Sequence, residues 1–165
     1  MIWLRLCLFA MLLCAAGRAA ADGVVLTPEE ERWLSEHPVV VVGTYHEGFA
    51  PFESVVHERV QGMAPDYLAK LADSLGIRIT YRVFPDWPAL LNAARAGSID
   101  LLMDISPTAE RSAYLHFSQP YFEDFPTLVT RVDGGRVQDM AGLRDATLVS
   151  LAGDATAETA RKYIP

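Results

Sequence analysis

The chain shows two hydrophobic periods, one typical of strands and one typical of helices, and the two alternate along the sequence. The β-branched run Val39–Val42 predicts a buried strand that ends at Gly43. Apolar residues alternate with polar ones over Ile77–Val83, which predicts a second, half-buried strand. The run Ile99–Ile105 is apolar except for two aspartates and predicts a third strand.

Segments with helical periodicity precede and separate these strands. Thr27, with a proline next to it and Glu30 three residues later, predicts a capped helix. A second helix is predicted over Pro65–Gly76, and a third over Asp86–Gly97 with the aspartate as its cap. Strands that alternate with helices of this length indicate βαβ units, a mostly parallel sheet and therefore an α/β fold.

The residues after Tyr121 predict the beginning of a second group of elements. Strands are expected at Thr127–Val132 and at Thr147–Leu151, with a short helix at Met140–Leu143 between them. A further helix is expected from about Thr156. These pieces amount to one more βα unit.

The first 21 residues have the pattern of a secretory signal peptide. Arg5 is followed by the apolar stretch Leu6–Ala16 and by the small residues Ala19–Ala21. The apolar stretch is too short for a good membrane-spanning helix. We therefore expect cleavage after Ala21, with Ala20 as the alternative, and export to the periplasm.

Removal of this segment changes what the composition says about chemistry. Both cysteines, Cys7 and Cys14, lie within it, so the mature chain would have neither a disulfide nor a cysteine ligand for a metal. The four histidines show no metal-ligand spacing, and we expect no metal and no cofactor. Without Arg5 and Arg18 the 14 basic side chains become 12 against 21 acidic ones, so the net charge moves from −7 to −9. That charge argues against nucleic acid as a partner.

The chemistry most open to interpretation follows the third predicted strand. The strand leads into Ser106-Pro107-Thr108 and then into a short helical turn with Arg111. Strand ends and helix starts hold anions in open α/β sheets, and a guanidinium fits a carboxylate through two parallel hydrogen bonds. The pattern predicts a carboxylate receptor. The alternatives are that Arg111 is a surface residue bridging Glu110, and that Thr108 only caps the turn.

Three spaced motifs in this region carry a resemblance to a known family. Ser98-Ile99-Asp100-Leu101-Leu102, Thr108-Ala109-Glu110-Arg111 and Phe117-Ser118-Gln119-Pro120-Tyr121 together resemble the signature of the family 3 periplasmic solute-binding proteins, the bilobed Venus flytrap domains that bind amino acids. The resemblance implies a periplasmic binding protein-like fold of type II. It implies a signal peptide at 1–21, a lead-in helix at 22–38, a nearly complete first lobe at 39–130 and a truncated second lobe at 131–165. On this interpretation the chain is an N-terminal fragment that binds ligand weakly or not at all by itself.

The resemblance also assigns ligand-binding roles to six residues and a catalytic role to none. They are Phe49, Trp87, Asp104, Ser106, Thr108 and Arg111. Phe49 and Trp87 would flank the ligand, although each could instead be a core aromatic. Asp104 stands where amino-acid binders often have a small hydroxyl residue, so it would repel a carboxylate or attract an ammonium group, unless the nearby backbone occupies it.

The resemblance leaves more than one functional class open. The helix within Leu26–Pro38 resembles the lead-in to the flytrap modules of hybrid sensor histidine kinases of the BvgS type, which favours a periplasmic sensor connected to inner-membrane kinase segments. One alternative is the binding subunit of an ABC amino-acid importer, with a permease as its partner. Another is an enzyme: a cyclohexadienyl dehydratase using Asp104 or Glu123 as general acid or base, or the lobe that precedes the catalytic domain of an MltF-type lytic transglycosylase.

Overall fold

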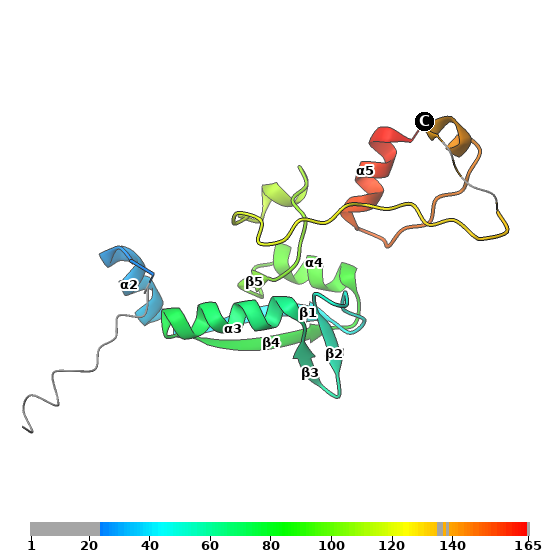
Figure 1. Cartoon of the computed structure of the whole chain (residues 1–165). Coiled ribbons are helices and arrows are strands. Elements are labelled where there is room, and N and C mark those ends of the chain that lie inside the picture. Colours follow the sequence, from blue (N-terminus) through cyan, green and yellow to red (C-terminus); the bar gives the residue numbers. More distant parts are fainter. Residues whose placement is uncertain (1–23, 135–136, 138, 165) are drawn as a thin grey trace, which may run out of the picture. The chain divides into compact units, whose positions relative to one another are not determined.

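The computed structural model describes residues 24–134, 137 and 139–164, so the expected signal peptide at 1–21 lies outside the described residues. The chain falls into two units, residues 1–36 and 37–165, and each is described by itself. The first unit contains helix α2 (Pro28–Glu36), drawn in blue in Figure 1.

The start of α2 is a capping box. The backbone N–H of Glu30 donates to Thr27 Oγ1 at 3.3 Å, and the backbone N–H of Thr27 donates to Glu30 Oε2 at 2.7 Å. Each side chain therefore satisfies a donor that the helix start leaves free, as the sequence predicts.

The second unit is built on a three-stranded parallel sheet with the order β4-β1-β5. Strand β1 (Val39–Tyr45) pairs with β4 (Arg78–Phe84) over its whole length, and with β5 (Leu101–Leu102) through Val42 and Gly43. The predicted α/β architecture with a parallel sheet is confirmed.

Two predicted strand boundaries are wrong, for separate reasons. Strand β1 continues through Gly43 to Tyr45. A Cβ at Gly43 would collide with Ile99 Cδ1 and lie 2.5 Å from Leu90 Cδ1, so the glycine allows close packing and does not end the strand. Strand β5 is shorter than the predicted run because Asp100 takes over the pairing: its N–H donates to the carbonyl of Val41 at 2.8 Å, and its carboxylate accepts from the N–H of Val41 at 2.8 Å.

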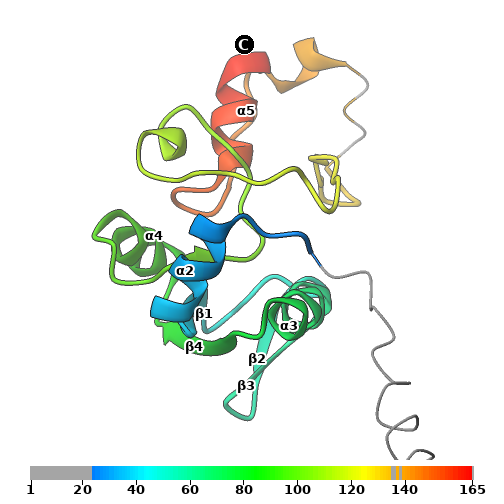
Figure 2. The ribbon, with the colours of Figure 1, turned by 90° about the vertical axis from the view of Figure 1, so that its left-hand side faces the viewer.

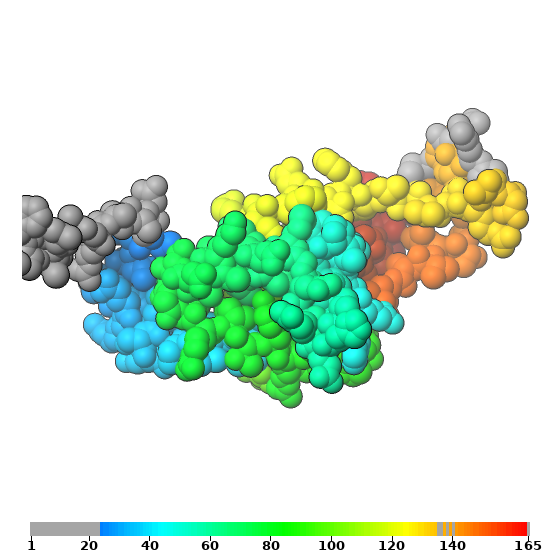
Figure 3. Space-filling view, turned by 60° about the horizontal axis from the view of Figure 1, so that its bottom comes forward, coloured from blue at the N-terminus to red at the C-terminus, as the bar shows by residue number. Residues whose placement is uncertain are grey.

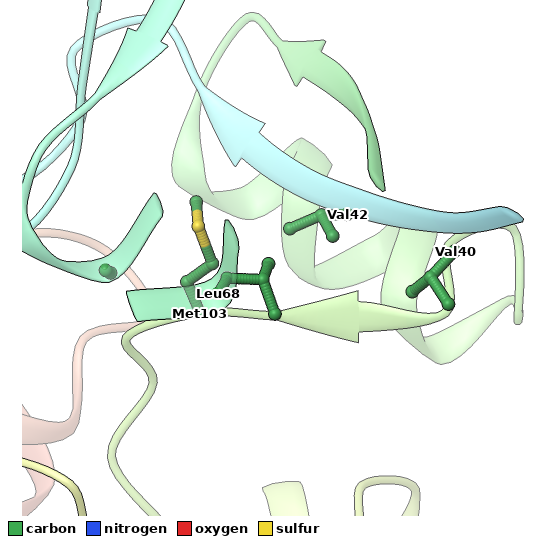
Figure 4. Close-up of a cluster of buried hydrophobic side chains, with 5 residues drawn as sticks. Val40, Val42, Leu68 and Met103 are labelled. Carbon is green, nitrogen blue, oxygen red and sulfur yellow. The ribbon is translucent and has the colours of Figure 1, made fainter. Parts of the chain in front are cut away.

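Helices α3 (Met63–Leu75) and α4 (Trp87–Arg95) flank the sheet on its two sides (Figure 2). Alternate β1 residues face opposite helices. Val40 and Val42 pack with Leu68 of α3 and with Met103, as Figure 4 shows. On the other face the buried cluster is formed by Tyr45, Trp87, Leu90 and Ile99.

The caps of these helices follow the sequence with one exception. The N–H of Ala89 donates to Asp86 Oδ1 at 2.8 Å, and Gly76 ends α3 in the left-handed conformation, both as predicted. Helix α3 starts at Met63, two residues before the predicted start, with Gly62 at its N-cap. The antiparallel hairpin of β2 (Ser54–Val56) and β3 (Arg59–Gln61) was not predicted, because three-residue strands carry little periodicity.

The rest of the second unit contains the short 3-10 helices η1 (Arg111–Ala113) and η2 (Met140–Leu143), and helix α5 (Ala155–Tyr163). The strands predicted at Thr127–Val132 and Thr147–Leu151 are absent from this described part of the chain. Val129 is 91 % exposed and Val149 87 % exposed, and no described strand lies beside either run to complete a ladder. Figure 3 shows the first run, in yellow, on the surface.

None of the described helices is long and apolar enough to cross a membrane.

Candidate functional site

The larger of two cavities lies at the C-terminal end of β5, and the smaller lies beside Thr108 and Arg111, which follow that strand in the chain. The larger, about 580 Å³, is lined by Phe49, Phe52, the segment 101–107 and the segment 116–125. The smaller, about 500 Å³, is lined by Thr108, Glu110 and Arg111 on one side and by residues of the segment 150–161 on the other. The end of a parallel sheet is where α/β folds place ligands.

Five of the six predicted site residues are divided between these cavities. Phe49, Asp104 and Ser106 line the larger one, and Thr108 and Arg111 line the smaller one. Trp87 lines neither of them and lies behind Arg111.

Arg111 is the best-anchored of the six. Only 4 % of the residue is exposed. Its Nη1 donates to the carbonyl of Ser106 and its Nη2 to the carbonyl of Gly153, each at 2.7 Å. Its backbone N–H donates to Thr108 Oγ1 at 3.2 Å, so the threonine caps the turn that carries the guanidinium.

The alternative that made Arg111 a surface residue is wrong. Glu110 is paired instead with Arg95, whose Nη2 lies 2.7 Å from Glu110 Oε1. Burial lowers the pKa of Arg111, and the carboxylate of Asp154 opposes that shift.

Trp87 has the position of a core aromatic that also supports Arg111. It is the first residue of α4, is 8 % exposed, and meets the ring of Tyr45 edge-on at 5.5 Å. The Arg111 guanidinium carbon lies 5.4 Å from the centroid of its ring. Its Nε1–H donates to the carbonyl of Gly153 at 3.2 Å, so one backbone oxygen accepts from both Trp87 and Arg111.

Phe49 belongs to an aromatic shelf made of Phe49, Phe52 and Phe122, all of which line the larger cavity. Phe49 is 52 % exposed and stacks on Phe52 with ring centroids 5.5 Å apart and an interplanar angle of 10°. Phe52 in turn meets Phe122 edge-on at 4.7 Å. The exposed ring faces the cavity, so the expectation that Phe49 contacts a ligand has the required geometry and stays a prediction.

Asp104 follows β5 and faces the same cavity. Its Oδ2 is buried without a hydrogen-bond partner, which means that the nearby backbone does not satisfy the carboxylate fully. Burial raises the pKa of Asp104 to about 6, and its own backbone N–H opposes the rise.

Glu53 is the site residue that the sequence did not reveal. It follows Phe52 of the aromatic shelf in the chain and is only 2 % exposed. Burial, and after it the charge of Asp104, raises the pKa of Glu53 to about 7. The hydroxyl of Thr44, fully buried at the end of β1, opposes this rise, although it does not reach good hydrogen-bond geometry.

Thr44, Glu53 and Asp104 form what we call the oxygen trio. Among the described residues, theirs are the buried side-chain oxygens that lack a hydrogen-bond partner: Thr44 Oγ1, Glu53 Oε2 and Asp104 Oδ2. In the same part of the chain, no group of three or more histidine, cysteine, aspartate or glutamate side chains is arranged to hold a metal ion.

Comparison with known proteins places the chain among sensor and solute-binding domains. The chain is 32% identical over 136 residues to the virulence sensor protein BvgS of Bordetella pertussis, a match that covers 80% of this chain and 11% of that protein. The crystal structure of the BvgS periplasmic domain superimposes with a TM-score of 0.55 at 26% identity, over 59% of this chain and 19% of that one.

A third similarity concerns the fold alone. The ancestral amino acid-binding protein AncCDT-1, a precursor of cyclohexadienyl dehydratase, superimposes with a TM-score of 0.66 at 21% identity, over 82% of this chain and 61% of that one. The fold is therefore that of the type II periplasmic binding proteins. The family model of the bacterial extracellular solute-binding proteins, family 3, matches residues 40–162. The chain belongs to this family.

Proposed function

We propose that this chain is the ligand-sensing part of a periplasmic Venus flytrap domain in a transmembrane sensor kinase, and that it recognises a small amino-acid-like carboxylate. The chain spans about a tenth of the length of the BvgS protein that it matches, 11% of it. The kinase and its membrane segments therefore belong to the proposal.

The proposal that the ligand has a carboxylate is supported by the environment of the Arg111 side chain. The guanidinium is almost fully buried, and its Nη atoms donate to two neutral carbonyls, those of Ser106 and Gly153. Among the described residues no carboxylate lies within ion-pair distance of it. A buried charge is costly unless it is paired, so this cation is suited to an anion that arrives from outside the chain.

We place that anion in the smaller cavity, which Arg111 lines. A ligand carboxylate could replace the carbonyl of Gly153 as acceptor for Arg111 Nη2, while Nη1 stays on Ser106. In this proposal residues 39–130 form the first lobe and residues 131–165 begin the second. The ligand then exchanges a contact between these two segments for contacts of its own.

Binding of a panel of L-amino acids and their methyl esters to the full-length protein tests this proposal. Esterification removes the negative charge and changes little else. We expect an amino acid at 100 times its dissociation constant to raise the free energy of unfolding by about 2.7 kcal/mol, and its ester to bind at least about tenfold more weakly. Equal binding of acid and ester would show that Arg111 does not pair with a carboxylate.

Arg111→Lys and Arg95→Lys make a matched pair for the same assay. Lysine keeps the charge but cannot hold the Ser106 carbonyl and the ligand carboxylate with two donors of one rigid plane, so only the first variant should weaken the preference for the free acid. Arg95 lies on the surface in its pair with Glu110, and its replacement should leave ligand binding unchanged.

Two other functions use the same fold. An ABC importer subunit would bind the same ligand class, and a sequencing read through the gene on both sides of these 165 codons separates it from a sensor, which requires a spanning helix and a kinase core. An enzyme is favoured by one observation, the raised pKa of Asp104, about 6, which suits a general acid or base near neutral pH. Turnover of prephenate or arogenate would establish the enzyme.

A further inference from the structure

Strand β4 has an edge with which no described strand pairs (Figure 1). It is an end strand of the sheet, and its only neighbour among the described strands is β1. None of its seven residues is buried, whereas five of the seven residues of β1 are. The edge is separate from the ligand site proposed above, because no residue of β4 lines either cavity.

The backbone of this edge has hydrogen-bonding groups that point away from β1. In a parallel pair, every second residue bonds to the neighbouring strand, and the residues between them face the other way. The N–H of Arg78 donates to the carbonyl of Pro38, directly before β1, at 2.9 Å. Arg78 and every second residue after it therefore bond to β1, and the N–H and C=O groups of Ile79, Tyr81 and Val83 point to the open edge.

Two arginines lie on one face of this strand. Arg78 and Arg82 are four residues apart, so their side chains leave the same face, and both residues are exposed. Among the described residues, neither guanidinium is within ion-pair distance of a carboxylate. Arg82 has only a long hydrogen bond of 3.4 Å to the carbonyl of Ser98 and a contact with the ring of Phe84. The edge thus presents two positive charges on a chain whose net charge is −7.

These charges disfavour a second copy of the chain as the strand that pairs with this edge. An antiparallel pair of two β4 strands centred on Thr80 would set Arg78 of one copy opposite Arg82 of the other. A pair centred on Tyr81 would set the two Arg82 side chains diagonally opposite each other. Like charges across a strand pair destabilise it, and opposite charges stabilise it. An incoming strand with carboxylates at the matching positions would replace repulsion by attraction.

We propose that the open edge of β4 is a docking site for an extended, acidic strand of a partner protein. The strand would pair with the backbone of Ile79, Tyr81 and Val83 and place two carboxylates, four residues apart, against Arg78 and Arg82. Backbone hydrogen bonds supply most of the affinity when a strand is added to a sheet edge, and side chains supply the specificity. This inference goes beyond the proposed function and does not rest on it.

Fluorescence polarisation with labelled peptides and the full-length protein tests this. The probe is a nine-residue peptide with blocked ends, in which threonine and valine alternate except for glutamate at its third and seventh residues. The control peptide has glutamine at both of these positions. We expect the glutamate peptide to bind at least about fivefold more tightly at low salt, and less so as salt screens the exposed charges.

Two double variants test the arginines. Arg78→Gln combined with Arg82→Gln should reduce the preference for the glutamate peptide to below about twofold. Arg59→Gln combined with Arg131→Gln makes the same change of charge at exposed residues away from this edge, and it should keep the preference.

A second pair of variants tests the backbone contact. Val83 is 40 % exposed and its N–H points to the open edge. Val83→Pro therefore obstructs an added strand without removing a hydrogen bond to β1. It should weaken the binding of both peptides at least about fivefold, while Val83→Thr should bind them as the unchanged protein does. Urea unfolding shows whether each variant is folded.

The possible results separate this proposal from its rivals. Failure of both peptides to bind, or equal binding of the two, would overturn it. So would a glutamate preference that survives loss of both arginines, or undiminished binding to folded Val83→Pro. A dimer of the full-length protein that Val83→Pro dissociates in sedimentation would identify a second copy as the occupant. Failure of amino acids to bind would remove the proposed function and leave this inference intact.

Discussion

Single side chains at this site are held in states that their local sequence does not announce. Glu53 follows Phe52 in a segment with the composition of an exposed loop, and yet it is almost fully buried. Its raised pKa depends in part on the charge of Asp104, which is 51 positions away in the chain. Arg111 and Thr108 could be predicted because strand, cap and guanidinium follow one another locally. The hydrogen bond from Arg111 to the carbonyl of Gly153 could not be predicted, since the acceptor is a backbone atom of a distant segment.

The raised pKa of Glu53 predicts how the free energy of unfolding depends on pH. The carboxyl group has a reference pKa of 4.5 and a pKa of about 7 in the folded chain. Between these values the folded state retains a proton that the unfolded state has lost, so stability falls as the pH rises through this window. The loss should be about 2–3 kcal/mol.

Urea unfolding between pH 4.5 and 8 measures this loss. Glu53→Gln keeps the shape and removes this titration, so it should flatten the slope mainly above about pH 6. The slope below that pH should remain, because burial also raises the pKa of Asp104, to about 6. Glu58→Gln, in the exposed β2–β3 turn, is the control and should retain it. An unchanged slope in Glu53→Gln would assign the effect to another group.

Whole elements could be predicted better than single residues where the sequence contains a helix cap or a helical repeat of apolar residues over several turns. Helices α2, α3 and α4 have these signals, and the sequence places them within two residues of their ends. The end of β1 was predicted wrongly at Gly43. A glycine in an apolar run can mark the end of a strand or a place where another side chain packs closely against the backbone, and only the position of Leu90 in the structure decides between the two. Apolar runs do not become strands without a neighbour, which explains the failure at Thr127–Val132.

The cap of α4 can be tested because it also positions Trp87. Asp86→Ala removes the acceptor for the N–H of Ala89 and should lower the free energy of unfolding by about 1 kcal/mol. Asp86→Ser should restore most of this loss. Asp73→Ala, an exposed position within α3, should change stability by less than about 0.5 kcal/mol. Chemical denaturation measures all three, and equal losses for Asp86→Ala and Asp73→Ala would contradict the cap.

At the scale of the whole second unit, β1 is the central element of the fold. This strand is paired on both edges and packed on both faces, by α3 and by α4. The resemblance to a known family predicted the type II fold, because three spaced motifs in one order are more specific than any single period. The division into lobes at residues 130 and 131 stays a prediction.

Amide hydrogen exchange should distinguish the paired backbone of β1 from the unpaired segment Thr127–Val132. The amides of Val40–Thr44 should exchange most slowly, because their exchange requires opening of the sheet itself. The amides of Thr127–Val132 should exchange fast, since no described strand pairs with them. Comparable protection of the two segments would show that Thr127–Val132 is paired in solution.

Because Trp87 and Arg111 both donate to the carbonyl of Gly153, the fluorescence of Trp87 should report whether the segment around Gly153 is in contact with Arg111. The chain has three tryptophans, Trp3, Trp33 and Trp87, and the last has its ring buried and its N–H bonded to that carbonyl. When the segment around Gly153 moves away, the indole loses its acceptor and meets water, so its emission shifts to the red. With Trp3 and Trp33 replaced by phenylalanine, the natural fluorescence of one residue would follow the opening and closing of the site in real time.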